Sequence, residues 1–154
     1  MTKRIVLFFV LFFCANFVQA QSLPTEIKSY LNKNYKGWKL QKDECYGPSQ
    51  PGKAVVTGNF NGDKKLDYAV KFVRGKKGFI IAFLAQKQAY KAFVLHDTDA
   101  ENVKYLSLGV WKKGGRYELG EQNVYVRYDA PSDFRCESDV GGIHLYRNGK
   151  FVAY

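Results

Sequence analysis

The sequence predicts an α+β fold in which one N-terminal amphipathic helix precedes a curved antiparallel sheet of about seven to nine strands. Three observations support this prediction. Apolar residues recur at helical spacing over residues 24–34, and beyond Gly37 the spacing changes to the alternation of strands. Short turn signals then separate the apolar runs as far as the carboxyl end, as hairpins require.

The predicted helix covers residues 24–34. Pro24 and Glu26 are typical of a first helical turn, and Gly37 is typical of the residues that follow a helix. The apolar stripe has the spacing i, i+3, i+4 and i+8, and consists of Ile27, Tyr30, Leu31 and Tyr35. We expect this stripe to face the core.

The remaining apolar runs have the length and composition of strands. They cover residues 38–41, 53–57, 67–74, 79–84, 90–95, 103–111, 116–119, 124–128, 143–146 and 151–154. Residues 79–84 are apolar without interruption, which is typical of a central strand covered on both faces. The dipeptides Gly114-Gly115 and Asn148-Gly149 are two-residue hairpin signals.

Residues 1–20 have the features of a secretory signal peptide. Lys3 and Arg4 precede an uncharged apolar run at 5–18, and Ala20 ends a small-residue cleavage pattern. A membrane anchor is one alternative, but about 14 apolar residues fall short of the ~20 that a bilayer needs. Lipid on Cys14 is another. We therefore expect a secreted or periplasmic protein, not membrane-spanning after processing, with one globular domain over residues 21–154.

The two cysteines that remain after processing are predicted to form a disulfide. Cys45 and Cys136 are an even pair in a small exported domain, and an oxidising compartment favours their bonding. The alternative, a metal site, needs further ligands nearby. The chain has only two histidines, His96 and His144, and both are distant from the cysteines in sequence.

The charge of the chain is basic and unevenly distributed. The formal net charge is +10, which falls to +8 when Lys3 and Arg4 leave with the signal. Residues 21–96 contain 14 Lys and Arg against 5 Asp and Glu, whereas residues 97–154 contain 8 against 9. A basic half attracts anionic partners such as an envelope or extracellular polymer. Because 17 of the 22 basic residues are lysines, a specific nucleic-acid site is not expected.

One segment has side chains that could hold a cation. Oxygen-bearing residues occupy positions 1, 3, 5 and 9 of a loop, and the backbone carbonyl at position 7 could add another ligand. These positions are Asn59, Asn61, Asp63, Asp67 and, for the carbonyl, Lys65. Alternating short oxygen ligands around a glycine are typical of loops that wrap Ca²⁺. A polar turn between two strands is the alternative, since Asn-Gly-Asp also favours turns.

Residues 58–70 resemble the calcium loop of FG-GAP/VCBS-type repeats. That loop reads roughly G-D-F-N-G-D-G-x-x-D-L-A-V. The resemblance implies a Ca²⁺ site, but Asn59 replaces its first aspartate and Lys64 its second loop glycine. With two carboxylates, the implied affinity is weak, ~10⁻⁴ to 10⁻³ M or weaker. The resemblance covers a single copy, so the propeller fold of that family does not follow from it.

Sequence motifs of common enzymes are absent. The chain contains no G-x-S-x-G elbow, H-E-x-x-H helix or Gly-rich phosphate loop. His96 is followed by Asp97, but a histidine and its orienting acid are defined in space and not by adjacency. His144 is interpreted as a strand residue, and the acidic residues over 97–101 as a solvated loop or a contribution to a cation site. No catalytic residue and no cofactor other than weak Ca²⁺ is predicted.

Three functions remain open on the sequence. The first is an exported binding or adhesion module that holds an anionic envelope or extracellular polymer, which the basic half and 11 tyrosines favour. The second is an exported inhibitor or immunity-type factor that blocks another exported protein, which small size and one disulfide favour. The third is a hydrolase without a recognisable motif. A deep pocket with converging titratable groups would favour this third function.

Overall fold

A computed structural model describes residues 23–45, 52–119, 121–136, 138 and 140–154. The predicted signal peptide therefore lies outside the described residues, as do Cys14 and the expected cleavage point after Ala20. Among the described residues, no helix has the length and apolar character that crossing a bilayer requires.

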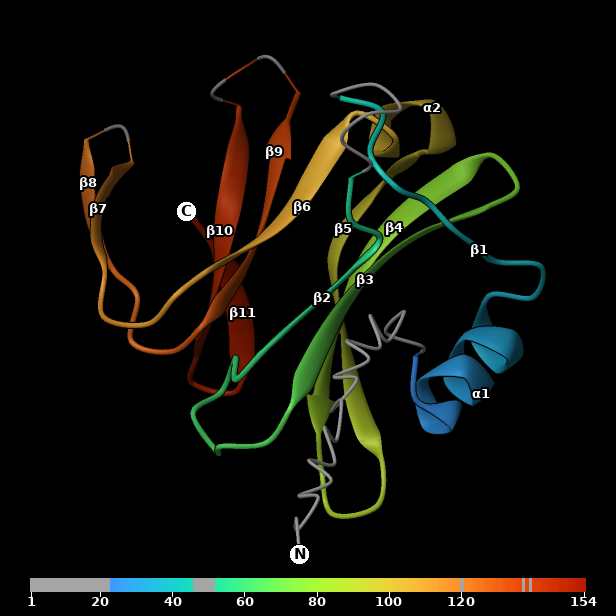
Figure 1. Cartoon of the computed structure of the whole chain (residues 1–154), viewed down its shortest axis with the longest axis horizontal. Helices are drawn as coiled ribbons and strands as arrows, with labels where there is room; N and C mark the ends of the chain where they lie inside the picture. Colours follow the sequence, from blue (N-terminus) through green and yellow to red (C-terminus); the bar gives the residue numbers. More distant parts are fainter. Residues whose placement is uncertain (1–22, 46–51, 120, 137, 139) are drawn as a thin grey trace, which may run out of the picture.

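The predicted fold class is wrong. The described chain is mostly β, with eleven strands in three sheets and only two helices, of ten and four residues. The sequence pattern locates strands but does not determine which strands pair. Here the chain leaves the first sheet after β5 (Tyr90–Asp99), passes through α2 (Ala100–Val103), and starts a second sheet with β6 (Leu106–Trp111). Figure 1 shows the resulting division into separate sheets.

The helix α1 (Thr25–Asn34) packs against the first sheet. Its apolar stripe places Ile27 and Leu31 in the core, where both are fully buried. Aromatic contacts extend this core, because Tyr30 lies edge-on to Phe83 with 5.4 Å between ring centroids. Amphipathic burial, and not helix propensity alone, is what stabilises a helix of this length.

The first sheet is antiparallel and is built around two long central strands, β3 (Asp67–Arg74) and β4 (Lys77–Ala85). Strand β5 pairs with the free edge of β4. Two short strands, β1 (Lys39–Leu40) and β2 (Val55–Gly58), share the opposite edge of β3 end to end. Strands β3 and β4 are buried along most of their length, which the uninterrupted apolar run predicted for residues 79–84 alone.

The second sheet has the order β11-β10-β9-β6. Its further strands are β9 (Ala130–Arg135), β10 (Gly141–Arg147) and β11 (Lys150–Ala153). The predicted hairpin turn joins β10 to β11, with positive φ at Asn148 and Gly149. A separate hairpin of β7 (Arg116–Leu119) and β8 (Gln122–Tyr125) completes the fold.

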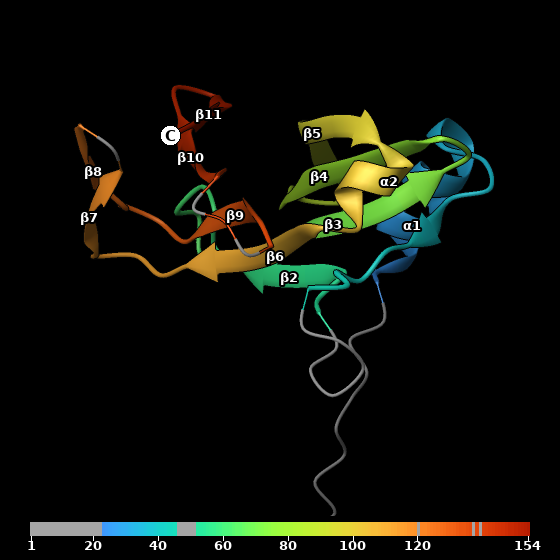
Figure 2. The same ribbon diagram turned by 90° about the horizontal axis from the view of Figure 1, so that it is seen from above.

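The two larger sheets face each other across a shared apolar core. Ile80 and Leu84 from the first sheet pack with Leu106 and Leu108 from the second. Figure 2, seen from above, shows β6 and β9 beside the layer formed by β3, β4 and β5. The space between the sheets is therefore where residues distant in sequence meet.

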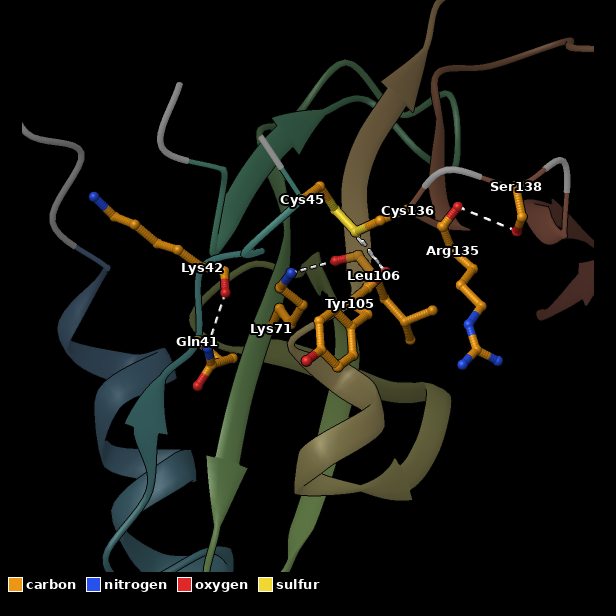
Figure 3. Close-up of a disulfide and its surroundings, with 9 residues drawn as sticks. All are labelled: Gln41, Lys42, Cys45, Lys71, Tyr105, Leu106, Arg135, Cys136 and Ser138. Carbon is orange, nitrogen blue, oxygen red and sulfur yellow. Dashed lines mark hydrogen bonds between the residues drawn. A yellow bond between two sulfur atoms is a disulfide. The ribbon is translucent and has the colours of Figure 1, made fainter. Parts of the chain in front are cut away.

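Cys45 and Cys136 form the predicted disulfide, with 5.2 Å between their Cα atoms. The bond joins the segment after β1 to the end of β9, and so connects the two sheets (Figure 3). The backbone N–H of Cys136 also donates to the carbonyl of Tyr105 at 2.8 Å. In the chain-entropy model, closing a loop of this length contributes roughly 4 to 5 kcal/mol.

Candidate functional site

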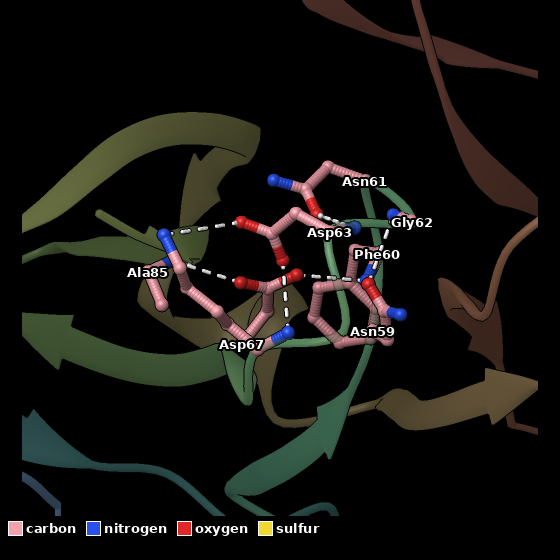
Figure 4. A network of polar contacts seen from close by, with 8 residues as sticks. Asn59, Phe60, Asn61, Gly62, Asp63, Asp67 and Ala85 are labelled. Carbon is pink, nitrogen blue, oxygen red and sulfur yellow. Dashed lines mark hydrogen bonds and ion pairs between the residues drawn. The ribbon is translucent and has the colours of Figure 1, made fainter. Parts of the chain in front are cut away.

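The loop over residues 59–67 is held by a buried carboxylate at its end. Asp67 is fully buried, and its two oxygens accept hydrogen bonds from the backbone N–H groups of Phe60 and Ala85, each at 2.8 Å. Burial raises the pKa of Asp67, although these hydrogen bonds act in the opposite direction. Figure 4 shows this side chain between the loop and the end of β4. Asp67 thus connects the 59–67 loop to the first sheet.

The other predicted ligands also accept hydrogen bonds from the loop backbone. Asn59 Oδ1 accepts from the N–H of Gly62 at 2.9 Å, and Asn61 Oδ1 from that of Asp63 at 3.0 Å. Asp63 Oδ1 accepts from the N–H of Lys65 at 2.9 Å. Such bonds are typical of Asx turns, which stabilise a loop locally.

These contacts bear on how a cation would fit. The ammonium of Lys65 lies 3.6 Å from Asp63 Oδ2, beside the carboxylate that a cation would need. Burial tends to raise the pKa of Asp63, but the hydrogen bonds from Lys65 and Asn61 outweigh it and leave the pKa lowered. Within the described residues no group of three or more His, Cys, Asp or Glu is arranged for a metal. Calcium binding at Asn59, Asn61, Asp63, Lys65 and Asp67 stays a prediction.

The same loop forms one wall of a cleft of about 510 Å³, here called the aromatic cleft. Its other walls come from the segment that follows β8 and from the β10–β11 turn. Aromatic rings, two arginines and short polar side chains line it: Phe60, Asn61, Tyr125, Arg127, Tyr128, Asp129, Leu145, Tyr146, Arg147 and Asn148. A mixed aromatic and polar lining is typical of ligand sites.

The walls of the aromatic cleft are fixed by packing beneath it. Gly62 has φ +83°, and a Cβ there would lie 2.2 Å from the ring of Tyr128, so only glycine lets the loop approach this ring. Tyr146 is held edge-on by Phe93 and Phe151, with centroid distances of 5.9 and 5.2 Å. The aromatic surface of the cleft is therefore preorganised.

Asp129 joins the segments around the cleft. Its carboxylate accepts hydrogen bonds from the backbone N–H groups of Asn59 at 3.3 Å and Lys113 at 3.2 Å. It also pairs with the ammonium of Lys112 at 3.2 Å. Burial tends to raise its pKa, but these contacts outweigh burial and the pKa is lowered. Asp129 is therefore an ionised carboxylate already engaged by several donors.

Because Asp129 is paired with Lys112, the two arginines give the aromatic cleft a positive charge. Arg127 and Arg147 are exposed and line it, and among the described residues neither forms an ion pair with an acidic side chain. Arg147 Nη1 donates to the hydroxyl of Tyr154 at 2.6 Å, and its guanidinium lies over the same ring. Guanidinium groups in this setting favour carboxylate, sulfate or phosphate ligands.

Both histidines of the chain meet on one buried carboxylate between the two sheets. His96 Nδ1, from β5, lies 2.7 Å from Asp133 Oδ2 on β9. His144 Nε2, from β10, contacts the other oxygen, Oδ1. Asp133 and His144 are nearly inaccessible, whereas the His96 side chain remains 36% exposed.

These three residues lie at a second hollow, the histidine cavity, of about 460 Å³. It is lined by apolar and polar residues from both sheets and from α2: Leu95, His96, Thr98, Asn102, Leu106, Asp133, Arg135, Val140, Gly141, Gly142, His144 and Ala153. The hydrogen bond that His96 donates to Asp133 raises the pKa of His96, which partial burial opposes. Burial tends to raise the pKa of Asp133, but the hydrogen bonds from His144 and His96 outweigh it, so the pKa is lowered.

A β-bulge turns His96 toward the second sheet. Ile80 of β4 pairs with His96, and Ile81 pairs with Val94, so Leu95 is an extra residue in β5. Directly opposed residues share a face of a sheet. Ile80 belongs to the core between the sheets, and His96 therefore faces that side too. Without the bulge, regular alternation would place His96 on the opposite face.

Lys71 is a buried cation in the same inter-sheet region. Its ammonium donates to the carbonyl of Leu106, as Figure 3 shows, and the side chain is fully buried. Burial lowers the pKa of Lys71 to about 8, although the charges of Asp43 and Asp133 act in the opposite direction. Its amine can therefore lose a proton in mildly alkaline solution.

Sequence reasoning located the 59–67 loop and both cysteines, but it missed both hollows. The acidic residue it noted beside His96 was Asp97, whereas the structure pairs His96 with Asp133. Asp97 instead lies 3.4 Å from Lys77. The only feature of the sequence that pointed to the histidine cavity is that the chain has just two histidines. This feature does not identify Asp133 as their partner.

Comparison of the chain with protein-family models, curated proteins and solved structures finds no match in any of the three.

Proposed function

We propose that this chain is an exported binding module that holds an anionic polysaccharide of a cell envelope or extracellular matrix in the aromatic cleft. The observation that supports it most directly is the pair of exposed arginines, Arg127 and Arg147, in a cleft walled by preorganised aromatic rings. The nearby carboxylate of Asp129 is already engaged by Lys112. An anionic group would therefore find two cations and little competing negative charge.

The aromatic side chains supply the second part of the recognition. Tyr125 is 49% exposed and Tyr146 is half-buried, so both present ring surface to a ligand. The apolar face of a sugar ring can pack on such rings, while hydroxyl groups bond to polar side chains such as Asn61 and Asn148. Guanidinium forks bind carboxylate or sulfate groups with two parallel hydrogen bonds.

The proposed site differs from the basic surface that first indicated an anionic partner. The excess of lysine lies in residues 21–96, whereas the two cleft arginines belong to the later half, which is nearly neutral. Lysine is a flexible, strongly hydrated charge, so the lysine surface would add attraction without selecting a ligand. Selectivity would come from Arg127 and Arg147.

Binding to immobilised polysaccharides tests this proposal. We expect the mature, oxidised chain to bind polygalacturonate or heparin and not neutral dextran. Changing Arg127→Gln or Arg147→Gln should weaken binding at least about tenfold, because a charged hydrogen bond contributes ~1.5–3 kcal/mol. Arg74→Gln is the matched control, since Arg74 is an exposed arginine at the end of β3 and does not line the cleft. Equal losses in all three variants would indicate non-specific attraction and would refute the proposal. Single-stranded DNA serves as the polyanion competitor.

One observation favours the inhibitor function as a second candidate. Among the described strands, β7 and β8 pair only with each other, and Figure 1 shows their hairpin extending away from the two larger sheets. Trp111 packs on Tyr117 at a centroid distance of 4.0 Å and so supports the hairpin. A supported, projecting hairpin suits insertion into another protein. Specific capture of one exported protein, lost when Tyr117 is changed to Ala, would favour this function over polysaccharide binding.

A further inference from the structure

The histidine cavity contains an imidazole with the orientation of a general base. The Nδ1 atom of His96 faces Asp133 at 2.7 Å, so Nε2 is the nitrogen left for another partner. An ionised carboxylate accepts hydrogen bonds only, so Nδ1 carries the proton when His96 is neutral, and Nε2 carries a free lone pair. This is the arrangement in which an aspartate orients a catalytic histidine.

Neighbouring residues restrict the movement of His96 and Asp133. Asp133 is buried, and His144 engages its second oxygen, so the carboxylate has little freedom to rotate. The bulge in β5 directs His96 toward the cavity side of the sheet. A purely structural contact between the sheets would need neither an accessible imidazole nor an adjoining hollow of about 460 Å³.

We propose that His96 and Asp133 form a general-base pair that hydrolyses a small carboxylic ester in the histidine cavity. His96 would be the catalytic residue, because its Nε2 meets the attacking water. Asp133 would be a positioning residue that acts through His96. This activity is separate from the polysaccharide binding proposed for the aromatic cleft.

The reaction needs no oxidant, metal or covalent enzyme intermediate. His96 Nε2 takes a proton from water while the water oxygen forms a bond to the ester carbonyl carbon. The resulting tetrahedral oxyanion collapses, and the bond from carbon to the alcohol oxygen breaks. His96 then returns its proton to the departing alkoxide, which leaves as the alcohol beside the free carboxylic acid. Water is consumed and the imidazole is regenerated.

The lining of the cavity indicates the class of ester. Leu95, Leu106 and Val140 give it apolar walls that suit a short acyl chain. Thr98, Asn102 and Arg135 place hydrogen-bond donors on these walls for developing negative charge. Arg135 forms no ion pair within the described part of the chain, so its guanidinium is also available to an anionic group on the substrate.

The experiment measures hydrolysis of 4-nitrophenyl acetate and of the mono-4-nitrophenyl ester of succinic acid by the oxidised mature chain. The proposal predicts a rate that exceeds that of free imidazole at equal concentration and lies at least about 100-fold above the buffer rate, because a positioned general base contributes ~10²–10⁴-fold. His96→Gln should reduce the rate to that of buffer alone. Asp99→Asn, which changes another exposed acid on the same strand, should leave the rate within about twofold.

The pH profile separates catalysis from a structural role. The rate should rise with pH as His96 loses its proton and then reach a plateau. Asp133→Asn should lower the plateau and shift the midpoint toward the usual histidine value of 6.5. The acidic groups around His96 are Asp133 and Asp97, and the side chains of Arg135 and His144 also line the cavity. Should Asp133→Asn not fold, Asp133→Glu and the His96 variant still decide the question.

Two results would overturn the proposal. One is a wild-type rate no faster than free imidazole with both esters. The other is a His96→Gln variant that is folded, as judged by its melting temperature, and hydrolyses as fast as the wild type. The cleft variant Arg147→Gln should keep full ester hydrolysis, so failure here and failure of polysaccharide binding are distinguishable.

Discussion

His96 Nδ1 lies 2.7 Å from Asp133 Oδ2, and this contact joins β5 of the first sheet to β9 of the second. The two strands belong to different sheets, so no backbone ladder holds them together. Among the described residues, these side chains connect the two strands directly. The contact therefore serves stability whatever chemistry the cavity performs.

Stability should depend on pH through this contact. The pKa of His96 is raised on folding, so its contribution is complete below 6.5 and is lost as pH rises through the raised value. The pKa of Asp133 is lowered, so its contribution is present above 3.8 and is lost as pH falls through the lowered value. We expect the melting temperature to fall from pH 6 to pH 8.5, and to fall less in His96→Gln. Identical slopes for the two proteins would contradict this account.

Removing the carboxylate of Asp133 should lower the free energy of unfolding at any pH between 3.8 and 6.5. Asp133→Ala leaves two imidazoles without their acceptor between the sheets, and we expect a loss of about 3 kcal/mol in the free energy of unfolding. Asp99→Ala is the control, because Asp99 is 72% exposed and lies 4.0 Å from Lys77. Its effect should stay within about 0.5 kcal/mol in urea denaturation. Comparable losses in both variants would show that Asp133 has no special structural role.

We expect replacement of the buried Asp67 to cost more stability than replacement of the exposed Asp63. Asp67→Ala leaves the N–H groups of Phe60 and Ala85 without their acceptor, and each unsatisfied buried donor costs ~1–3 kcal/mol. We expect a loss of at least about 2 kcal/mol without any added metal. Asp63→Ala, at the exposed part of the same loop, should lose less than about 1 kcal/mol. A larger loss for Asp63 would refute this account of the loop.

The calcium hypothesis for the 59–67 loop predicts a response to added metal. If the dissociation constant is ~10⁻³ M, 10 mM Ca²⁺ stabilises the folded chain by about 1.4 kcal/mol through mass action. The rise in melting temperature should disappear in Asp63→Ala and persist in Asp99→Ala. An unchanged melting temperature up to 10 mM Ca²⁺ would assign the loop to a turn held by its own hydrogen bonds.

Lys71 should affect stability in alkaline solution. Its pKa is lowered to about 8 from 10.5, so the unfolded chain binds this proton more tightly than the folded chain. Stability contributed by this residue therefore rises between about pH 8 and 10.5, by an amount on the order of 3 kcal/mol. Denaturation of the wild type and of Lys71→Met over this range isolates the effect from other groups. A rise of the same size in Lys71→Met would exclude Lys71 as its source.

The sequence predicted some elements of the fold and missed others. The stripe containing Ile27 and Leu31 and the turn at Asn148 depend only on neighbours in the chain, so local pattern suffices for them. Strand β9 was not among the predicted strands, and it contains Pro131, a residue that disfavours a central strand. Pro131 lies one residue outside the β9–β10 pairing, which begins at Ser132, and so removes no donor from that pairing.

The missed strand also explains the missed site. Asp133 lies on β9, and without that strand no acidic residue could be placed opposite His96. The bulge at Leu95 further reverses the face that alternation assigns to His96. The aromatic cleft was missed for a related reason, since Arg127 and Arg147 come together only when the segment after β8 meets the β10–β11 turn. Pairing between distant strands determines both hollows.

The most direct test of the central claim is where an anionic saccharide contacts the chain. Titration of the ¹⁵N-labelled chain of residues 21–154 with trigalacturonate, followed by NMR, reports this residue by residue. We predict amide shifts concentrated at Asn61, Arg127, Tyr146 and Arg147, with saturation that Arg147→Gln weakens at least about tenfold and Arg74→Gln does not. Shifts spread over the lysine-rich surface of residues 21–96, with no change at the cleft, would contradict the proposed function.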